Sequence, residues 1–392
     1  MILAFWICLF VVAYTFVGYG FLLYVLVKIK RTIKKETPLQ KDVFFPTVTL
    51  LVAAYNEEDL ILDKVADSLA LNYPKEKLQL IFVTDGSTDN TPILLKNCAD
   101  ITVLHTDDRN GKMAAIKRAM PFVEGEILVF SDANTFLNAD AIKELVKNYQ
   151  NPKVGAVAGE KRILVDKHAD ASAAGEGFYW KYESFLKKLD YQLYSNVGAA
   201  GELFSVRRSL YPYVESDTII DDHMIAMRIA ESGYIIAYEP EAYAMETASA
   251  NTREELKRKI RIAAGGMQSI LRLHKAANPF YNPTLTFQYI SHRVLRWTVT
   301  PFFLVLILLL NMIICATYPA LIYQILLAAQ VLFYVFALIG WYFEHKNLKI
   351  KAFFVPYYFC LMNYAVAAGI FRYFKKNQSA AWEKSIRKTK TA

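Results

Sequence analysis

Four short polar motifs each follow an apolar run, and their carboxylates, amides and glycine are residue types that bind nucleotides and remove protons. The motifs are Tyr55-Asn56-Glu57, Asp85-Gly86-Ser87-Thr88-Asp89, Asp132-Ala133-Asn134 and Asp221-Asp222-His223. Acidic and glycine-bearing loops at those spacings suit a site that holds a nucleotide diphosphate and deprotonates a hydroxyl. Each motif also has an ordinary structural interpretation, and it is the combination of all four that favours chemistry.

The first two motifs stand at the ends of neighbouring predicted strands. Asp85-Gly86 follows the run Leu80–Thr84, and an Asp-Gly pair by itself most often marks a turn. Tyr55 and Glu57 end the preceding strand in the same way. Because ligands bind beyond the carboxyl ends of parallel strands, the two loops together are suited to hold a base and a ribose.

The third motif places two oxygen ligands, Asp132 and Asn134, just beyond the run Ile127–Phe130. Such a pair can share a hard divalent cation bound to a diphosphate. The alternative is that one of them caps a helix. Lys112 opens a further predicted helix, where it can meet a phosphate, although a solvated surface lysine is the alternative there.

The fourth motif opens a predicted helix from about 220 to 232 that contains Arg228. Acidic residues in a first helical turn are ordinarily favourable to the helix dipole. The chemical interpretation is that one of the two carboxylates is a general base for a sugar hydroxyl, since a helix start can offer a carboxylate an open face. His223 fits better as a neighbour than as a ligand or base.

Residues 252–275 predict an amphipathic helix that begins with a capping box of Thr252 and Glu255. Its apolar residues gather on one side at 3.6 residues per turn. The opposite side carries Arg258, Arg261, Gly265, Gln268 and Arg272. The helix can lie on the membrane with its arginines on lipid headgroups, or it can point Arg258 and Arg261 at a leaving diphosphate. Both can hold at once, and we expect both.

The elements that must position these residues follow from short β-branched runs that alternate with helical patterns between about 45 and 160. This alternation is typical of a parallel α/β sheet. Strands are expected at Thr47–Ala53, Leu78–Thr84, Ile101–His105, Ile127–Phe130 and Val154–Ala158, and around 197–206. Helices are expected at about 58–70, 90–98, 112–122, 140–149 and 172–190.

Both ends of the 392-residue chain, which is 54% hydrophobic, are apolar enough to enter a membrane. Residues 2–27 carry no charge, and this run is long enough to cross a bilayer. A signal peptide would need a basic start and a small-residue cleavage site, and neither is evident, so we expect a retained helix. Further spans are expected at about 299–317, 320–343 and 352–371. Asn311, Gln324 and Gln330 suggest that the later helices pack together or line a path.

The net charge of +8 gathers beside these spans, which favours anionic lipid over nucleic acid as the partner. Basic residues after the first span place the N-terminus outside and residues 28–298 in the cytosol. Three full spans after that would leave the strongly basic residues 372–390 outside. Either residues 352–371, which contain Pro356, form a re-entrant or interfacial hairpin, or the charge rule fails. The four cysteines show no metal-ligand spacing and are expected to be structural thiols.

In this order the motifs resemble those of the membrane-bound inverting glycosyltransferases of family 2. That group includes cellulose, chitin, hyaluronan and poly-N-acetylglucosamine synthases and single-sugar transferases acting on lipids. The resemblance covers about 45–275 and the membrane layout. It implies a nucleotide-sugar-binding α/β domain of GT-A fold, with a mostly parallel sheet and flanking helices, plus transmembrane helices and an amphipathic interface helix. The expected division is a transmembrane helix at 1–27, a basic linker at 28–44, the cytosolic GT-A domain at 45–250, the interface region at 251–298, transmembrane segments at 299–371 and a basic tail at 372–392.

The resemblance also implies roles for individual residues. Asp222 takes the place of the aspartate in the family's Thr-Glu-Asp motif, because Arg228 matches that motif's downstream arginine, and would be the general base. Arg258 and Arg261, on the helix that resembles the Gln-x-x-Arg-Trp interface helix, would stabilise the leaving diphosphate. The implied substrate-binding residues are Tyr55, Glu57, Asp85, Asp89, Lys112, Asp132, Gly201, Glu202, Arg208, Asp221 and Gln268, and Asp132 with Asn134 would hold Mg or Mn.

Two positions depart from the family pattern. Asn134 stands where the metal motif usually has a second aspartate, and it still offers an oxygen. Ile262 stands where polymer synthases have the tryptophan that supports the growing chain, and it cannot stack on a sugar. Polymer synthesis and single transfer to a lipid therefore both stay open.

The expected function is transfer of a sugar, with UDP as the expected carrier, to a hydroxyl of a saccharide or lipid-linked acceptor in polysaccharide biosynthesis. Membrane lipid and an export or synthase subunit are the expected partners, and nucleic acid is not. The alternative is a non-catalytic nucleotide-sugar-sensing or assembly subunit of a polysaccharide export complex. A small-molecule transporter is excluded, because the large polar middle section predicts a folded α/β domain.

Overall fold

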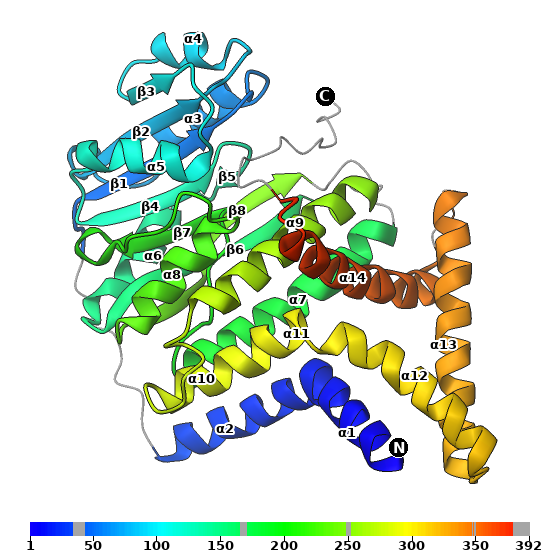
Figure 1. Cartoon of the computed structure of the whole chain (residues 1–392). Helices are drawn as coiled ribbons and strands as arrows, with labels where there is room; N and C mark the ends of the chain where they lie inside the picture. The colour runs from blue at the N-terminus through cyan, green and yellow to red at the C-terminus, as the bar shows by residue number, and fades with distance from the viewer. Residues whose placement is uncertain (34–43, 165–170, 248–251, 347, 349, 379–392) are drawn as a thin grey trace.

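The computed structural model describes residues 1–33, 44–164, 171–247, 252–346, 348 and 350–378. One eight-stranded sheet forms the middle of the chain, with helices on both faces, and apolar helices from both ends of the chain lie together beside it (Figure 1). Most of the predicted linker 28–44 and of the tail 372–392 lies outside the described residues. Lys28, Lys30 and Arg31 are described, and they continue the first helix rather than begin a linker.

The sheet has the strand order β3-β2-β1-β4-β7-β6-β8-β5. The strands are β1 Val48–Ala54, β2 Leu78–Asp85, β3 Thr102–Thr106, β4 Ile127–Asp132, β5 Phe136–Leu137, β6 Val154–Leu164, β7 Leu203–Arg207 and β8 Ile235–Thr247. β1, β2, β3, β4, β6 and β8 run in one direction, and β5 and β7 run against them. The predicted mostly parallel sheet is confirmed.

The central strand explains why the sheet forms where it does. Every residue of β1 is buried, since both of its faces are covered, and it reads as a continuous apolar and β-branched run. The helices that cover the two faces are α3 Ile61–Leu69, α4 Thr91–Lys96, α5 Lys112–Ala119, α6 Ala141–Lys147, α7 Ala171–Leu193 and α8 Asp221–Glu231. One core packs α5 and α8 against the sheet, and the other packs α3 and α6. Strand order reverses beside β1, which is where open α/β sheets bind nucleotides.

Four helical segments of the described chain are long and apolar enough to span a membrane: Ile2–Ile33, Thr300–Thr317, Leu321–His345 and Lys351–Phe374. The first comprises α1 Ile2–Ala13, a π-helical turn Tyr14–Gly18 and α2 Tyr19–Ile33, and Figure 1 shows it bending at that turn. The others are α12, α13 and α14. A short helical region leads into them: α10 Pro283–Tyr289, a π-helical turn Ile290–Val294 and α11 Leu295–Trp297.

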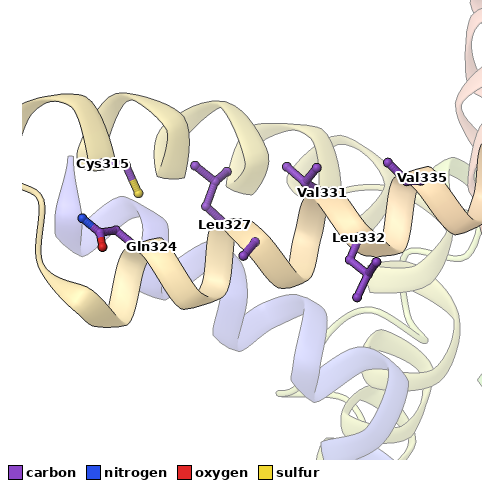
Figure 2. A pocket seen from close by; sticks show the side chains of 7 residues that line it. Cys315, Gln324, Leu327, Val331, Leu332 and Val335 are labelled. Carbon is purple, nitrogen blue, oxygen red and sulfur yellow. The ribbon is translucent and has the colours of Figure 1, made fainter.

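Polar residues inside these spans hold the helices together. The Asn311 amide of α12 donates to the Tyr323 carbonyl of α13 at 3.3 Å and to the Gln330 side chain at 3.4 Å. The same two helices border a cavity of about 510 Å³, lined by Cys315, Gln324 and aliphatic side chains of α13 (Figure 2). That cavity is apolar and holds none of the predicted site residues, so the chemistry must lie elsewhere.

α9, Thr252–Arg272, connects the membrane helices to the sheet domain. Gly369 of α14 lies against it, since a Cβ at Gly369 would stand 2.7 Å from the Ile260 carbonyl oxygen and 2.6 Å from the Ala263 Cβ. On another side, Gly265 lies against Ile219 and Ile220, just before α8. The helix therefore lies between protein surfaces. Thr252 is its first residue and donates its hydroxyl to Glu344 of α13.

Candidate active site

The carboxyl ends of β1, β2 and β4 bring three predicted site residues to one edge of the sheet. Ala53 pairs with Val83 on one side and with Asp132 on the other, so the three strands end at the same level. Tyr55 and Asp85 follow within two residues of that level. The predicted meeting of these motifs is what the strand register produces.

The loops after β1 and β2 are tied together as one unit. Asn56 adopts a left-handed conformation, φ 54°, in which its side-chain oxygen accepts the Thr88 N–H at 2.8 Å. Asp89 accepts the N–H groups of Thr91 and Glu58, at 3.0 and 3.2 Å. Asp89 thus fixes the loops in the structure, although the sequence had suggested a substrate contact.

Asp85 holds the loop that leads into α5. Its buried carboxylate accepts the N–H groups of Asn110 at 2.8 Å and Gly111 at 2.6 Å, and Arg118 approaches it at 3.3 Å. Gly86, at φ 66°, lets this loop approach, because a Cβ there would stand 2.5 Å from the Arg109 Cβ. Asp85 and Gly86 therefore decide where Arg109 stands.

The guanidinium of Arg109 covers the ring of Tyr55. Its central carbon lies 3.9 Å from the ring centroid, and one of its nitrogens donates to the Tyr55 hydroxyl at 2.8 Å. The cavity between these residues and Asp85 has a volume of only about 10 Å³. A planar ligand on Tyr55 would need Arg109 to move. Sequence reasoning missed Arg109, although it belongs to the polar loop just before Lys112.

Lys112 is the cation at the centre of the site. Its ammonium donates to Asp132 at 2.9 Å and lies 3.5 Å from Asp221. Burial alone would lower its pKa, but Asp132, Asp221 and Asp222 raise the pKa well above its ordinary value. Lys112 therefore stays charged and is no solvated surface lysine.

Asp222 is the carboxylate with an open face. Asp221 beside it is buried, whereas Asp222 is half-buried. Burial, and then the neighbouring Asp221, raise the pKa of Asp222 to about 7, against the effect of Lys112. A carboxylate with that pKa is suited to accept a proton near neutral pH.

Gly201 marks the point on which these groups converge. A Cβ there would lie 3.5 Å from the Lys112 ammonium, 3.6 Å from Asp222 and 3.7 Å from Asp132. The missing side chain leaves room for a reacting group beside the base and the cation. The fold thus brings together four residues that come from separate strands, loops and helices.

Asp132 and Asn134 carry oxygens of the kind that a hard divalent cation binds. The Asp132 side chain is 21% exposed, and Asn134 lies two residues further along the turn after β4. Among the described residues no group of three His, Cys, Asp or Glu side chains could hold a metal ion. Asp132 and Asn134 would therefore supply two oxygens, and a diphosphate would have to supply others.

The arginines of α9 contact the protein around this site. Arg258 donates to Glu202 at 2.8 Å, and Arg261 donates to the Ile219 carbonyl at 3.2 Å. Arg272 binds Asp217 at 2.7 Å. The expectation that these arginines lie on lipid headgroups is therefore wrong, whereas Arg258 and Arg261 do lie on the side of the carboxylates.

Gln268 clamps the segment before α8. Its amide donates to the Asp217 carbonyl at 2.9 Å and accepts the Ile219 N–H at 3.0 Å. It therefore positions the start of the helix that bears Asp221 and Asp222. A direct substrate contact, as the sequence had suggested, would require it to leave these bonds.

Arg208 lies away from the site. β7 runs antiparallel to β4, with Leu203 opposite Ser131 and Arg207 opposite Ile127. Arg208 therefore lies beside the amino-terminal end of β4, away from the carboxyl ends where the site lies. Its guanidinium donates to the Val123 carbonyl at 2.6 Å. Its assignment as a substrate-binding residue is wrong.

Comparison with known proteins agrees with this geometry. Residues 49–212 match the family described as Glycosyl transferase family 2. The chain is 29% identical over 235 residues to a poly-beta-1,6-N-acetyl-D-glucosamine synthase of Staphylococcus aureus (strain MSSA476), covering 57% of this chain and 56% of that protein. It is 26% identical over 255 residues to the enzyme of the same name from Staphylococcus epidermidis, covering 61% and 60%. The match thus spans little more than half the length of these curated relatives.

A solved structure is similar over nearly the whole chain. The mannosyltransferase PcManGT from Pyrobaculum calidifontis, in complex with GDP-Man and Mn2+, superposes with a TM-score of 0.72 at 24% identity. The similarity covers 96% of this chain and 100% of that one. It confirms the predicted GT-A fold.

Proposed function

We propose that this chain, which carries a glycosyl transferase family 2 domain at residues 49–212, is a membrane-bound inverting glycosyltransferase. It moves a sugar from a nucleoside diphosphate sugar to a hydroxyl of a saccharide or lipid-linked acceptor. The observation that carries this proposal is the convergence of Asp222, Asp132 and Lys112 around Gly201. A half-buried base, a cation and a metal-binding carboxylate at one point are what glycosyl transfer from a diphosphate requires.

In the proposed reaction Asp222 accepts the proton of the acceptor hydroxyl. The hydroxyl oxygen forms a bond to the anomeric carbon, and the bond from that carbon to the diphosphate breaks on the opposite side, with inversion. Lys112 and the two arginines Arg258 and Arg261 offer positive charge to the departing diphosphate. A divalent cation at Asp132 and Asn134, Mg or Mn, would neutralise the same charge. The Mn2+ in the related mannosyltransferase supports this proposal.

The nucleoside is proposed to occupy the strand ends beside Tyr55 and Asp85, with Arg109 moving off the Tyr55 ring. Glu57 is buried at the start of the same loop. UDP is the proposed carrier, in keeping with the poly-N-acetylglucosamine synthases among the relatives. The GDP-Man in the mannosyltransferase makes GDP-linked sugars the second donors to test.

The membrane arrangement is proposed to place the sheet domain in the cytosol. Lys28, Lys30 and Arg31 follow the first span, which puts that end of the helix inside. The expected further partners are membrane lipid, a saccharide or lipid-linked acceptor, and an export or synthase subunit. Polymer synthesis would give a product that grows with time, and single transfer would give one glycolipid step.

The deciding experiment measures nucleoside diphosphate release by the purified protein in lipid. A panel of UDP- and GDP-sugars is offered with Mn2+ or Mg2+ and a lipid extract, alongside Asp222→Asn. We expect release with one donor and a loss of at least about 100-fold in Asp222→Asn, the size of a general-base contribution. Nucleotide binding should survive in that variant.

Two outcomes would contradict the proposal. A wild-type rate in Asp222→Asn would show that another group is the base. Nucleotide binding without release from any donor would instead favour the non-catalytic sensing or assembly subunit, against which the presence of Asp85, Asp132 and Asp222 argues.

A further inference from the structure

The carboxylate of Glu202 binds two cations through the same oxygen. The Arg258 guanidinium donates to this oxygen at 2.8 Å, and the Lys161 ammonium donates to it at 2.9 Å. The three side chains differ in burial: Lys161 is 2% exposed, Glu202 6% and Arg258 20%. One of the two partners is thus buried, and the other is partly exposed.

Glu202 is held in place by its backbone. The hydroxyls of Ser131 and Thr135 donate to its carbonyl at 3.3 and 3.4 Å, which ties it to the turn after Asp132. It also follows Gly201, the point on which the carboxylates of the site converge. The Glu202 backbone is therefore held in place, and its carboxylate is only 6% exposed and bound by Lys161, so rearrangement is expected of Arg258.

Lys161 is a fixed cation. It stands on β6 and is bound on its other side by Glu246 of β8. Its ammonium lies 5.1 Å from the centroid of the Trp180 ring on α7. Because these groups enclose it, Lys161 cannot leave Glu202 for a ligand. Arg258, on α9, has the long side chain and the exposure to do so.

The charges around Glu202 keep it ionised. Burial opposes ionisation, but Lys161 and Arg258 hold the pKa of Glu202 well below its ordinary value. Burial also lowers the pKa of Lys161 to about 8, with Arg258 acting in the same direction and Glu202 against it. A buried carboxylate left without a counter-ion is strongly unfavourable, so Glu202 needs one of its two cations at all times.

We propose that Arg258 exchanges Glu202 for the diphosphate of the donor, and that Lys161 is the positioning residue that makes this exchange possible. In the empty site Arg258 rests on Glu202. When the diphosphate enters, Arg258 swings onto it, and Lys161 remains as the counter-ion of Glu202. This inference rests on the proposed function, since the incoming anion is the donor's diphosphate.

The exchange has a consequence for substitutions. In Lys161→Met, Arg258 becomes the counter-ion that Glu202 cannot lose, so it resists leaving for the diphosphate. Replacing the carboxylate as well, in Lys161→Met with Glu202→Gln, removes that demand and frees Arg258 again. Glu246 loses its ion pair with Lys161 equally in both variants, so the difference between them reports the effect of Glu202. The second substitution would thus restore the diphosphate affinity that the first one lowers. A merely structural role of Lys161 does not predict this recovery.

Lys187→Met is the matched control. Lys187 is also buried, stands 5.6 Å from the centroid of the Trp180 ring, and is paired with a carboxylate, Glu160, at 3.8 Å. Lys187 lies against Glu160 and the rings of Trp180 and Tyr238 rather than against Glu202. Lys161→Met and Lys187→Met therefore each remove a buried lysine beside Trp180, but Lys161→Met alone removes a counter-ion of Glu202.

The test is calorimetric titration of the four proteins with UDP and with GDP, each with Mn2+, together with the donor KM and kcat from diphosphate release. We expect nucleoside diphosphate affinity to fall about tenfold in Lys161→Met, with a matching rise in donor KM. The nucleoside diphosphate affinity should change less than about twofold in Lys187→Met. In the double variant it should return to within about threefold of wild type. Thermal unfolding of each protein accompanies the titrations.

The outcomes separate this inference from the proposed function. Equal losses in Lys161→Met and Lys187→Met, or no recovery in the double variant, would overturn the exchange and leave transfer intact. The expected affinities with no release from any donor would support the exchange at a nucleotide site and overturn the transferase. If neither nucleotide binds the wild type, both are wrong.

Discussion

At the scale of single residues, the titration of Asp222 decides how the proposed reaction depends on pH. Its pKa is raised to about 7, first by burial and then by Asp221. A general base acts only when deprotonated, so kcat/KM should fall about tenfold for each pH unit below 7 and level off above it. Lys112 keeps its charge throughout this range, because the surrounding carboxylates raise its pKa.

A pH profile of diphosphate release with saturating metal checks this expectation. A profile that is flat between pH 5.5 and 8 would contradict Asp222 as the base, and one that rises only above pH 8 would point to a different group. Circular dichroism at each pH would separate titration of the base from unfolding.

The residues of the site show what a sequence can and cannot supply. Tyr55, Asp85 and Asp132 were predictable, because each ends a recognisable apolar run and parallel strands end at one edge. Arg208 was misplaced because it is close in sequence to Gly201, and only the antiparallel direction of β7 reveals that it leaves the site. Arg109 and Lys161 were missed, since each acts through a neighbour that is distant in the chain.

At the scale of elements, β8 is a strand that was not predicted from the sequence. It runs from Ile235 to Thr247 and contains Pro240, and a proline within a run argues against a strand. The structure accommodates Pro240 at an irregularity, where the pairing of β6 with β8 shifts between Ala158 and Glu160. β5, with two residues, is too short for any periodic pattern.

The contact between α9 and α14 depends on a glycine, and this gives an element-scale prediction. In Gly369→Ala the new methyl group would stand 2.6 Å from the Ala263 Cβ and 2.7 Å from the Ile260 carbonyl oxygen. Overpacking of this kind costs about 1–3 kcal/mol and should push α14 away from the helix that carries Arg258. We expect a lower unfolding temperature in detergent and a lower kcat.

Gly18→Ala is the control for this change, because its nearest contact would be an ordinary 3.4 Å. Alanine is the better helix former by about 1 kcal/mol, so Gly18→Ala should be neutral or slightly stabilising. A Gly369→Ala protein as stable and active as Gly18→Ala would show that α14 is not tightly packed on α9.

At the scale of the whole molecule, the structure addresses the conflict between the count of spans and the charge of the C-terminal end. Figure 1 shows α12 leading away from the sheet domain and α13 returning to its level, where Glu344 meets Thr252 of α9, whereas α14 turns back from α13 and lies alongside α9. The Gly369 contact holds it there. A helix bound along the sheet domain stays on the domain's side of the membrane. The hypothesis of an interfacial segment is therefore preferred to a failure of the charge rule.

This arrangement predicts that the two ends of the chain lie on opposite sides of the membrane. α1, α12 and α13 would cross, and the basic residues Arg372, Lys375 and Lys376 would share the cytosolic side with Lys28–Arg31. In a variant with its four cysteines replaced, Lys376→Cys should resist an impermeant maleimide in intact cells. Tyr318→Cys, at the exposed turn between α12 and α13, should react. Because both positions are exposed to solvent or headgroups, equal labelling in lysed cells controls for accessibility. Fast labelling of Lys376→Cys in intact cells would mean that α14 crosses, and that its packing along α9 must then occur within the bilayer.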